Sequence, residues 1–393
     1  MSNVFNSLWK QFKTLFIVHV LMGYIFVVSG LIVCGLMLLC YLTIWPWNKC
    51  LYRKIVVRLA YLHWSQFTFL AQWWSGSNAT VHLENVDDLQ YIGQEHNITM
   101  MNHKYDIDWL MAWVLSERLQ MLGGTKIYGK SSLKLVPLIG WAWTFTESIF
   151  LKREWDKDKE IIKRDLSFLR EYPDNYWVTL LLFCEGTRFT EEKLIKSNEI
   201  ARKKGLKELK HHLLPRTKGF VLSMHGVKEK FSSILDLTIG FRSDGAQPTL
   251  MNVICGRPVK AELYVRRIPL SQIPTDNDEN CSDWVHKLFQ EKDEIYDSFV
   301  KEGEYKIGTK REIPKRPHDL ITYLCWAVLL LTPLFYYIGA IFINGSLLIK
   351  IIFLLIISLA TIGVRLMIMV TEIKQGSKYG TRETVNNNSK KID

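Results

Sequence analysis

The sequence predicts an α/β domain between an N-terminal membrane helix, or pair of helices, and a C-terminal transmembrane hairpin. Hydrophobic residues make up 48% of the 393 residues, and the longest apolar runs lie near the two ends of the chain. Between these runs, short apolar segments alternate with segments of helical spacing, a pattern typical of an α/β sheet domain. Lys and Arg number 50 against 39 Asp and Glu. This basic balance suits phosphate-bearing ligands, an anionic membrane face or nucleic acid.

Residues 1–77 are predicted to form a membrane anchor followed by an interfacial helix. Leu15–Trp45 is almost without charge, and as one helix at ~1.5 Å per residue it is longer than the ~30 Å hydrocarbon core. It therefore forms either one tilted span or a re-entrant pair of helices broken near Gly30. No A-x-A-like cleavage site follows, so we expect the segment to remain as an anchor. Leu51–Trp74 mixes arginines with aromatic residues, and it is either an amphipathic helix on the membrane or a helix packed on the domain core.

Residues 78–305 are predicted to form a cytosolic domain. Four short apolar runs are strand candidates: "NITMMNH", "YWVTLLLFCEG", "ILDLTIGF" and "AELYVRRIPL". The segment "WDKDKEIIKRDLSFLREY" places Ile162, Leu166 and Leu169 on one side of a helix that Pro173 ends. We expect "TDNDENCSDW" to be a loop that opens a helix near Trp284, and "RKKGLKELKHH" to be an exposed helix.

The C-terminal part is predicted to comprise a basic linker over 306–319, a transmembrane hairpin over 320–365 and a cytosolic tail over 366–393. Two apolar runs, Leu320–Ile343 and Leu347–Gly363, are separated by "NGS". Basic residues on both flanks place both ends of the hairpin in the cytosol by the positive-inside rule. These residues are Lys310, Arg311, Lys315 and Arg316 before the hairpin and Lys374 and Lys378 after it. The side of the N-terminus stays open, because basic residues precede the first apolar run as well.

Several common catalytic arrangements are absent from the sequence. There is no G-x-S-x-G motif, which disfavours a serine hydrolase, and neither a Walker A loop nor a G-x-G-x-x-G loop is present. The cysteines are odd in number, scattered and without a C-x-x-C pair; they are Cys34, Cys40, Cys50, Cys184, Cys255, Cys281 and Cys325. This pattern argues against a disulfide framework or a zinc site and for a reducing compartment. We therefore predict no metal site.

The stretch "MNHKYDIDWL" places His103 and Asp108 where an apolar strand ends. On a straight helix these two side chains would point apart, at ~3.6 residues per turn. They meet if His103 lies in the turn before a helix and Asp108 in the first helical turn. A carboxylate bonded to one ring nitrogen then fixes the tautomer, and the other nitrogen takes a proton from an alcohol. Spacing alone leaves Asp106 as a rival partner for His103.

Basic and small residues follow three other apolar stretches. In "FCEGTRFT", Gly186 permits a tight turn, Arg188 suits phosphate oxygens, and Glu185 either accepts from substrate hydroxyls or orients the arginine. "IFLKREW" supplies Arg153 after another apolar stretch, and "LLPRTKGF" supplies further basic residues beside Pro215; these are Arg216 and Lys218. Basic groups at several strand or loop ends of one α/β domain predict an anionic ligand.

Together these motifs resemble the glycerolipid acyltransferase family, typified by the 1-acylglycerol-3-phosphate (lysophosphatidic acid) acyltransferases. The four family blocks match, in order, Asn102–Asp108, Phe150–Arg153, Glu185–Arg188 and, more loosely, Leu213–Pro215. "WPWNKCLYRK", "VPLIGWAWTF", "LLPRTKGF" and the hairpin resemble the gamma/delta-type animal enzymes. The resemblance therefore covers most of the chain.

The resemblance implies a glycerol-3-phosphate acyltransferase-like fold, with a mixed sheet flanked by helices. His103 is then the catalytic base and Asp108 its orienting carboxylate. The substrate-binding residues implied are Asn102, Arg153, Glu185, Gly186, Thr187, Arg188, Pro215 and Lys218. The implied reaction moves a fatty acyl group from acyl-CoA, as co-substrate, to the sn-2 hydroxyl of lysophosphatidic acid. No cofactor and no nucleic acid are implied, and the partners are the lysophospholipid, acyl-CoA and membrane lipids.

Some positions depart from the family pattern and leave the head group and acyl chain open. Cys184 replaces a common proline before E-G-T-R, and Glu147 replaces a small residue of the second block. Rival hypotheses are the same chemistry on another acceptor, such as lysophosphatidylinositol, lysocardiolipin or glycerol 3-phosphate, and a non-catalytic lipid-binding protein that shapes membranes. The tail contains Lys390 and Lys391, which resemble the dilysine signal of multi-pass endoplasmic reticulum proteins. The oligomeric state is open.

Overall fold

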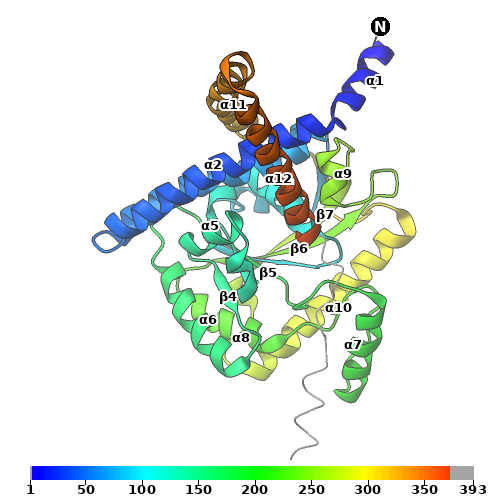
Figure 1. Ribbon diagram of the computed structural model, residues 1–393. Helices are drawn as coiled ribbons and strands as arrows, with labels where there is room; N and C mark the ends of the chain where they lie inside the picture. Colours follow the sequence, from blue (N-terminus) through cyan, green and yellow to red (C-terminus); the bar gives the residue numbers. More distant parts are fainter. Residues whose placement is uncertain (1, 372–393) are drawn as a thin grey trace, which may run out of the picture.

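The computed structural model describes residues 2–371 and contains, in that part of the chain, one eight-stranded sheet in the order β4-β3-β5-β2-β6-β7-β1-β8 (Figure 1). The strands are β1 (Asn78–Leu83), β2 (Asn97–Met101), β3 (Thr125–Lys130), β4 (Ile149–Leu151), β5 (Thr179–Leu182), β6 (Ser233–Phe241), β7 (Lys260–Pro269) and β8 (Thr309–Arg311). Neighbours from β4 to β6 run parallel, β7 pairs antiparallel with β6, and β8 pairs antiparallel with β1. The predicted mixed sheet is confirmed, and the four strand candidates are β2, β5, β6 and β7.

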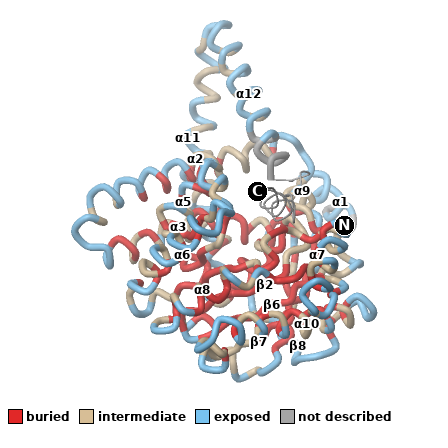
Figure 2. The backbone as a smooth tube through the Cα atoms, turned by 90° about the horizontal axis from the view of Figure 1, so that it is seen from below, coloured by how far each residue is buried: buried red, intermediate tan, exposed pale blue. Residues whose placement is uncertain are grey.

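Helices cover both faces of the sheet. The helices of the domain are α4 (Asp108–Arg118), α5 (Ile139–Phe145), α6 (Trp155–Arg170), α7 (Glu191–Lys203), α8 (Thr217–Val227), α9 (Leu250–Ile254) and α10 (Asp278–Glu302). α6, α8 and α10 share one buried apolar cluster with β2 and β5, whereas α4 shares a second cluster on the other face. Figure 2 shows the buried residues concentrated along the strands and the helices that flank them. α10 begins at Asp278, earlier than the position near Trp284 that the sequence predicts, because the Asn277 side chain accepts from the backbone N–H groups of Glu279 and Asn280.

The predicted exposed helix over 202–212 is wrong. α7 ends at Lys203, and Gly205 follows with a positive φ of 67°. The next backbone N–H groups donate to side chains instead of to helical carbonyls: Leu209 N–H to Asn198, and the N–H groups of Lys210 and His211 to Asp293. These bonds replace the i→i−4 ladder that a helix requires.

The segment around Leu51–Trp74 packs on the domain core, which was one of its two interpretations. α3 (Lys49–Phe69) buries Tyr52, Val56, Ala60 and Trp64 at four-residue spacing. Trp64 lies 5.2 Å from Trp113 of α4, measured between ring centroids. α3 is therefore part of the same hydrophobic core as the sheet, although it precedes the first strand.

The apolar segment near the N-terminus forms one helix. α2 (Phe16–Thr43) follows α1 (Ser2–Phe12) and continues through Gly30 without a break, so a helix pair divided there is not observed. Gly30 allows a close approach, because a Cβ at this position would lie 2.7 Å from Cε1 of His63 on α3. α2 also contacts the domain through Cys34, whose Sγ lies 3.4 Å from the carbonyl oxygen of Leu138.

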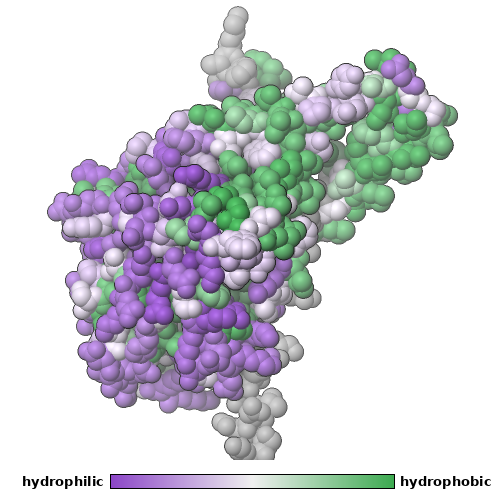
Figure 3. Space-filling view, turned by 90° about the vertical axis from the view of Figure 1, so that its left-hand side faces the viewer, coloured by the Kyte–Doolittle hydropathy of each residue, from purple (hydrophilic) through white to green (hydrophobic). Residues whose placement is uncertain are grey.

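The predicted hairpin consists of α11 (His318–Asn344) and α12 (Leu347–Thr371), and it projects away from the domain (Figure 2). By length and composition alone, α2 and α11 are apolar enough to cross a membrane, and the apolar part of α12, Leu347–Gly363, is shorter. Tyr323 of α11 stacks on Phe69 at 3.8 Å, which joins the hairpin to α3. Figure 3 shows the apolar surface gathered on one side of the molecule and the polar surface on the other.

Candidate functional site

The turn between β2 and α4 brings His103 and Asp108 together. His103 Nδ1 lies 3.0 Å from Asp108 Oδ2, and the same oxygen accepts the backbone N–H groups of Lys104 at 2.7 Å and Tyr105 at 2.8 Å. Asp108 is the first residue of α4 and is fully buried. The residues therefore meet at a strand-to-helix corner, as their spacing predicts, and Asp106 does not take the place of Asp108.

The imidazole of His103 is held by two contacts and remains partly accessible. Its ring stacks on Phe183 at 4.3 Å between centroids, and 24% of the side chain is exposed. Because a carboxylate only accepts hydrogen bonds, the hydrogen of the neutral ring lies on Nδ1. The lone pair therefore lies on Nε2, the nitrogen that is placed to receive a proton.

Glu185 is buried and binds backbone groups. Its Oε1 accepts the N–H of His103 at 2.9 Å, and its Oε2 accepts the N–H of Leu213 at 3.0 Å. Burial raises the pKa of this carboxyl group to about 8. Phe189 N–H also donates to the carbonyl oxygen of His103 at 2.7 Å. Glu185 thus joins three of the sequence blocks, and both of its oxygens are engaged by the backbone.

Cationic side chains surround Gly186, which has a positive φ of 68°. Arg153 donates through Nη2 to the Gly186 carbonyl oxygen at 3.2 Å, and a Cβ at Gly186 would lie 2.8 Å from Nε of Arg216. On the other side, Arg188 forms an ion pair with Asp106. Burial, followed by the charge of Arg216, lowers the pKa of Arg153. The arrangement concentrates positive charge at one partly accessible loop, as an anionic ligand requires.

Lys193 belongs to this cationic cluster and escaped the sequence analysis. Its ammonium donates to Thr187 Oγ1 at 3.0 Å and to the Arg188 carbonyl oxygen at 2.8 Å. It therefore fixes the E-G-T-R loop from α7. In the sequence it is one of two lysines in "EEKLIK", and no local pattern distinguishes it from a solvated helix residue.

The other predicted site residues lie at the edges of this corner. Asn102 is buried and exchanges two hydrogen bonds with the backbone of Ile239, at 3.1 and 2.8 Å, which fixes the end of β2 to β6. Pro215 is buried. Lys218 lies in the first turn of α8 with its ammonium 5.6 Å from the ring centroid of Trp155. Cys184 is buried, and burial raises the pKa of its thiol.

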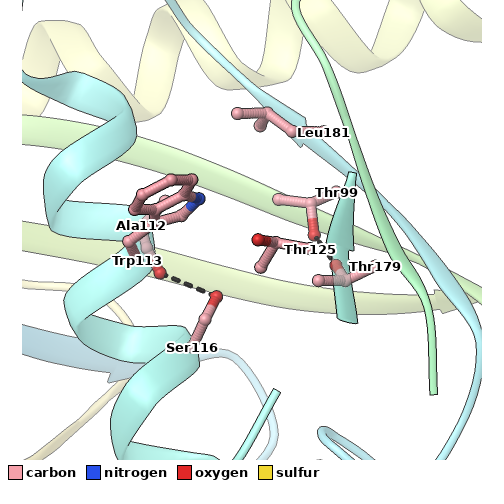
Figure 4. A pocket seen from close by; sticks show the side chains of 7 residues that line it. All are labelled: Thr99, Ala112, Trp113, Ser116, Thr125, Thr179 and Leu181. Carbon is pink, nitrogen blue, oxygen red and sulfur yellow. Dashed lines mark hydrogen bonds between the residues drawn. The ribbon is translucent and has the colours of Figure 1, made fainter. Parts of the chain in front are cut away.

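A small cavity of ≈ 20 Å³ lies apart from this corner. It is lined by Thr99, Ala112, Trp113, Ser116, Thr125, Thr179 and Leu181 (Figure 4). Thr125 and Thr179 begin their strands, whereas His103 and Glu185 follow the carboxyl ends of theirs. The cavity has room for about one water molecule, and its position excludes it as the catalytic centre.

Comparison with known proteins gives the same family as the motifs. The family model "Acyltransferase" matches residues 79–222, and "Acyltransferase C-terminus" matches residues 252–326. The chain is 44% identical to human 1-acyl-sn-glycerol-3-phosphate acyltransferase delta, over 95% of this chain and 97% of the relative. It is 43% identical to the mouse gamma enzyme, over 96% and 98% of the two chains, and 42% identical to the human gamma enzyme, over 94% and 97%. The protein therefore belongs to the acyltransferase family, among the gamma- and delta-type 1-acyl-sn-glycerol-3-phosphate acyltransferases.

Proposed function

We propose that this enzyme moves a fatty acyl group from acyl-CoA to the sn-2 hydroxyl of lysophosphatidic acid and forms phosphatidic acid. One observation carries the proposal: His103, oriented by Asp108, lies beside a loop whose Gly186 is flanked by Arg153, Arg188 and Arg216. A base for an alcohol and a site for a phosphate thus share one corner of the sheet. The names of the relatives give the same acceptor.

In the proposed reaction, His103 Nε2 removes the proton of the sn-2 hydroxyl as its oxygen attacks the thioester carbon of acyl-CoA. Asp108 holds the ring and stabilises the imidazolium that forms. Collapse of the tetrahedral intermediate breaks the C–S bond, and the imidazolium returns the proton to the thiolate of CoA. No metal and no covalent enzyme intermediate take part.

The loop around Gly186 would hold the acceptor phosphate. Arg153 and Arg188 supply charged N–H donors, and the absence of a side chain at Gly186 lets Arg216 lie close to the loop backbone. Thr187 and Lys218 extend the polar surface of the loop. We assign Asn102, Glu185 and Pro215 to positioning, because all three are buried and the first two bind backbone groups.

We further propose that the hairpin crosses the membrane. α2 then lies along the membrane surface on its cytosolic side. One side of α2 is buried from Val18 to Met37, and Tyr41 lies 6.1 Å from Phe145 of the domain. A helix that crossed the bilayer away from the domain would not keep such contacts along its length. The dilysine residues behind the endoplasmic reticulum proposal, Lys390 and Lys391, lie outside the described residues, as do Lys374 and Lys378.

The decisive experiment is an acyl-CoA-dependent assay with lysophosphatidic acid and a panel of other lysophospholipids. His103→Ala and Asp108→Asn are expected to lose ~10²-fold or more in rate, while expression and membrane insertion are retained. His225→Ala is the matched control, because His225 is an exposed histidine paired with Asp278 on another part of the domain. Full activity of His103→Ala, or a poor rate with lysophosphatidic acid relative to the panel, would overturn the proposal.

A further inference from the structure

Asp106 pairs with Arg188, although it lies between the two residues assigned to proton transfer. The turn from His103 to Asp108 thus contains two carboxylates with different partners: Asp108 binds the imidazole, and Asp106 binds the guanidinium. About a quarter of each side chain is exposed, 28% for Arg188 and 26% for Asp106. The ion pair is therefore at the surface of the site, where a ligand reaches it.

Asp106 is held in a rigid turn. Its carbonyl oxygen accepts the indole N–H of Trp109 at 2.8 Å. The backbone of the two preceding residues, Lys104 and Tyr105, donates to Asp108. The backbone that carries the Asp106 side chain is consequently held by the same turn that holds the catalytic pair.

The backbone of Arg188 is fixed as well, through its carbonyl bond to Lys193 and through Phe189 N–H, which donates to His103. What these bonds leave open is the direction of the long side chain. The neighbouring cations repel it: burial, and then the charges of Arg188 and Arg153, lower the pKa of Lys193. A guanidinium in such a cluster turns outward unless an anion holds it.

A partly exposed ion pair contributes little to folding stability, so stability does not account for this one. A guanidinium presents five N–H donors in a planar fork, so one carboxylate orients it while it still binds a second anion. The pair therefore has the geometry of a support for the phosphate contact.

We propose that Asp106 is a positioning residue that directs Arg188 toward the acceptor phosphate. The turn then sets the distance between the base at His103 and the phosphate contact at Arg188. In lysophosphatidic acid the reacting sn-2 oxygen and the phosphorus are separated by C2, C3 and the ester oxygen, so that distance is a property of the acceptor. This inference rests on the proposed function and adds a residue to it.

The test is a double-mutant cycle on the full-length enzyme in detergent micelles. Asp106→Asn is expected to raise KM for lysophosphatidic acid by about tenfold while kcat stays within about threefold, because a charge-assisted contact is weakened before chemistry begins. Asp106→Glu restores most of the affinity. In an Arg188→Gln background, Asp106→Asn changes KM by less than about twofold, because its partner is already absent. Glu191→Gln, an exposed carboxylate near Lys104, is the control and leaves KM unchanged.

Three results would overturn the proposal. The first is a fall in KM for Asp106→Asn, and the second is the same rise in KM with and without Arg188. The third is a loss of kcat with a shifted pH profile, which would show that Asp106 acts on His103. Failure of the proposed function looks different, because the wild type then makes no phosphatidic acid. In that case the same cycle is run on direct binding of lysophosphatidic acid in micelles, where the expected pattern is identical.

Discussion

The carboxyl group of Glu185 lies 2.9 Å from the backbone nitrogen of His103. Its other oxygen binds Leu213, so one buried side chain sets the relative positions of the catalytic turn, the E-G-T-R loop and the proline block. The glutamate of the E-G-T-R motif therefore supports the site by holding the backbone of the two other blocks. Its neighbours Gly186 and Arg188 belong to the loop that we propose binds the acceptor phosphate.

Replacement of Glu185 by glutamine tests this arrangement. The amide group offers only one acceptor oxygen, so one of the two backbone N–H groups then faces another donor. We expect a loss of about 1–3 kcal/mol in the free energy of unfolding and at least a tenfold fall in kcat/KM, because His103 shifts with its backbone. Thermal unfolding in detergent and steady-state kinetics measure the two effects. Glu199→Gln, in an exposed part of α7, controls for loss of a carboxylate.

The same variant has a signature in its pH dependence. The pKa of Glu185 in the folded enzyme, about 8, is raised above its ordinary value of 4.5, so the folded state holds a proton that the unfolded state releases. The contribution of Glu185 is fully present below pH 4.5 and is lost as pH rises through 8. The stability gap between wild type and Glu185→Gln should therefore narrow from pH 5 to pH 8.5. A gap that widens over this range would contradict the buried, protonated carboxyl group.

Gly186 offers a paired comparison with Gly205. Both glycines have a positive φ, 68° and 67°, but a Cβ at Gly186 would collide with Arg216 whereas nothing lies within 4 Å of a Cβ at Gly205. Each alanine variant should lose about 1 kcal/mol of stability from backbone strain. Only Gly186→Ala should also raise KM for the acceptor, because it displaces Arg216. Equal kinetics for the two variants would show that the loop does not contact the acceptor.

The junction between domain and hairpin depends on Asp319 of α11. This buried carboxylate accepts from Gln72 Nε2 and from Trp73 Nε1, each at 2.8 Å, and both donors follow α3 directly. Asp319→Ala leaves two donors without this acceptor, so we expect about 2–5 kcal/mol of destabilisation and faster proteolysis between domain and hairpin. Glu312→Ala, an exposed carboxylate of the linker, is the control. Unchanged cleavage and unfolding would mean that the hairpin is only an anchor.

The sequence was sufficient to predict the local part of the site, but it was insufficient to predict the contacts between distant segments. His103 and Asp108 are five positions apart, so the predicted corner alone decides whether they meet. Glu185 and His103 are 82 positions apart, and Glu185 and Leu213 are 28 apart. Such pairings depend on the order of the strands in the sheet, which the spacing of residues along the sequence does not predict. The sequence therefore indicated that the Glu185 side chain contacts the substrate. In the fold its carboxylate binds backbone N–H groups instead.

For α3, too, the sequence was insufficient, because it did not decide where the whole helix lies. Its arginines and aromatic residues suggested a membrane surface as readily as a core. Arg53 is buried because Glu147 binds its guanidinium at 2.8 and 3.0 Å and Glu171 adds a third contact. The departure of Glu147 from the family pattern is thereby explained: it is the partner of a buried arginine on α3. Only the folded arrangement reveals that partner.

Lys126 of β3 supplies the last prediction. It is fully buried, its Nζ lies 5.0 Å from the ring centroid of Tyr172, and no hydrogen bond to Nζ is found within residues 2–371. Burial lowers the pKa of this ammonium from 10.5 to about 7. A buried charge without a hydrogen bond is costly, so Lys126→Met, which keeps the length of the side chain, should stabilise the enzyme by about 1–3 kcal/mol at neutral pH.

The sign of the pH dependence follows from the lowered pKa. Between pH 7 and 10.5 the unfolded chain holds a proton on Lys126 that the folded chain has released, so wild-type stability rises with pH in this window. The advantage of Lys126→Met is therefore largest below pH 7 and shrinks toward pH 10. Unfolding at pH 6 and pH 9, with the exposed Lys130→Met of the same strand as control, measures it. Destabilisation of Lys126→Met at both pH values would instead assign the ammonium a stabilising contact with the Tyr172 ring.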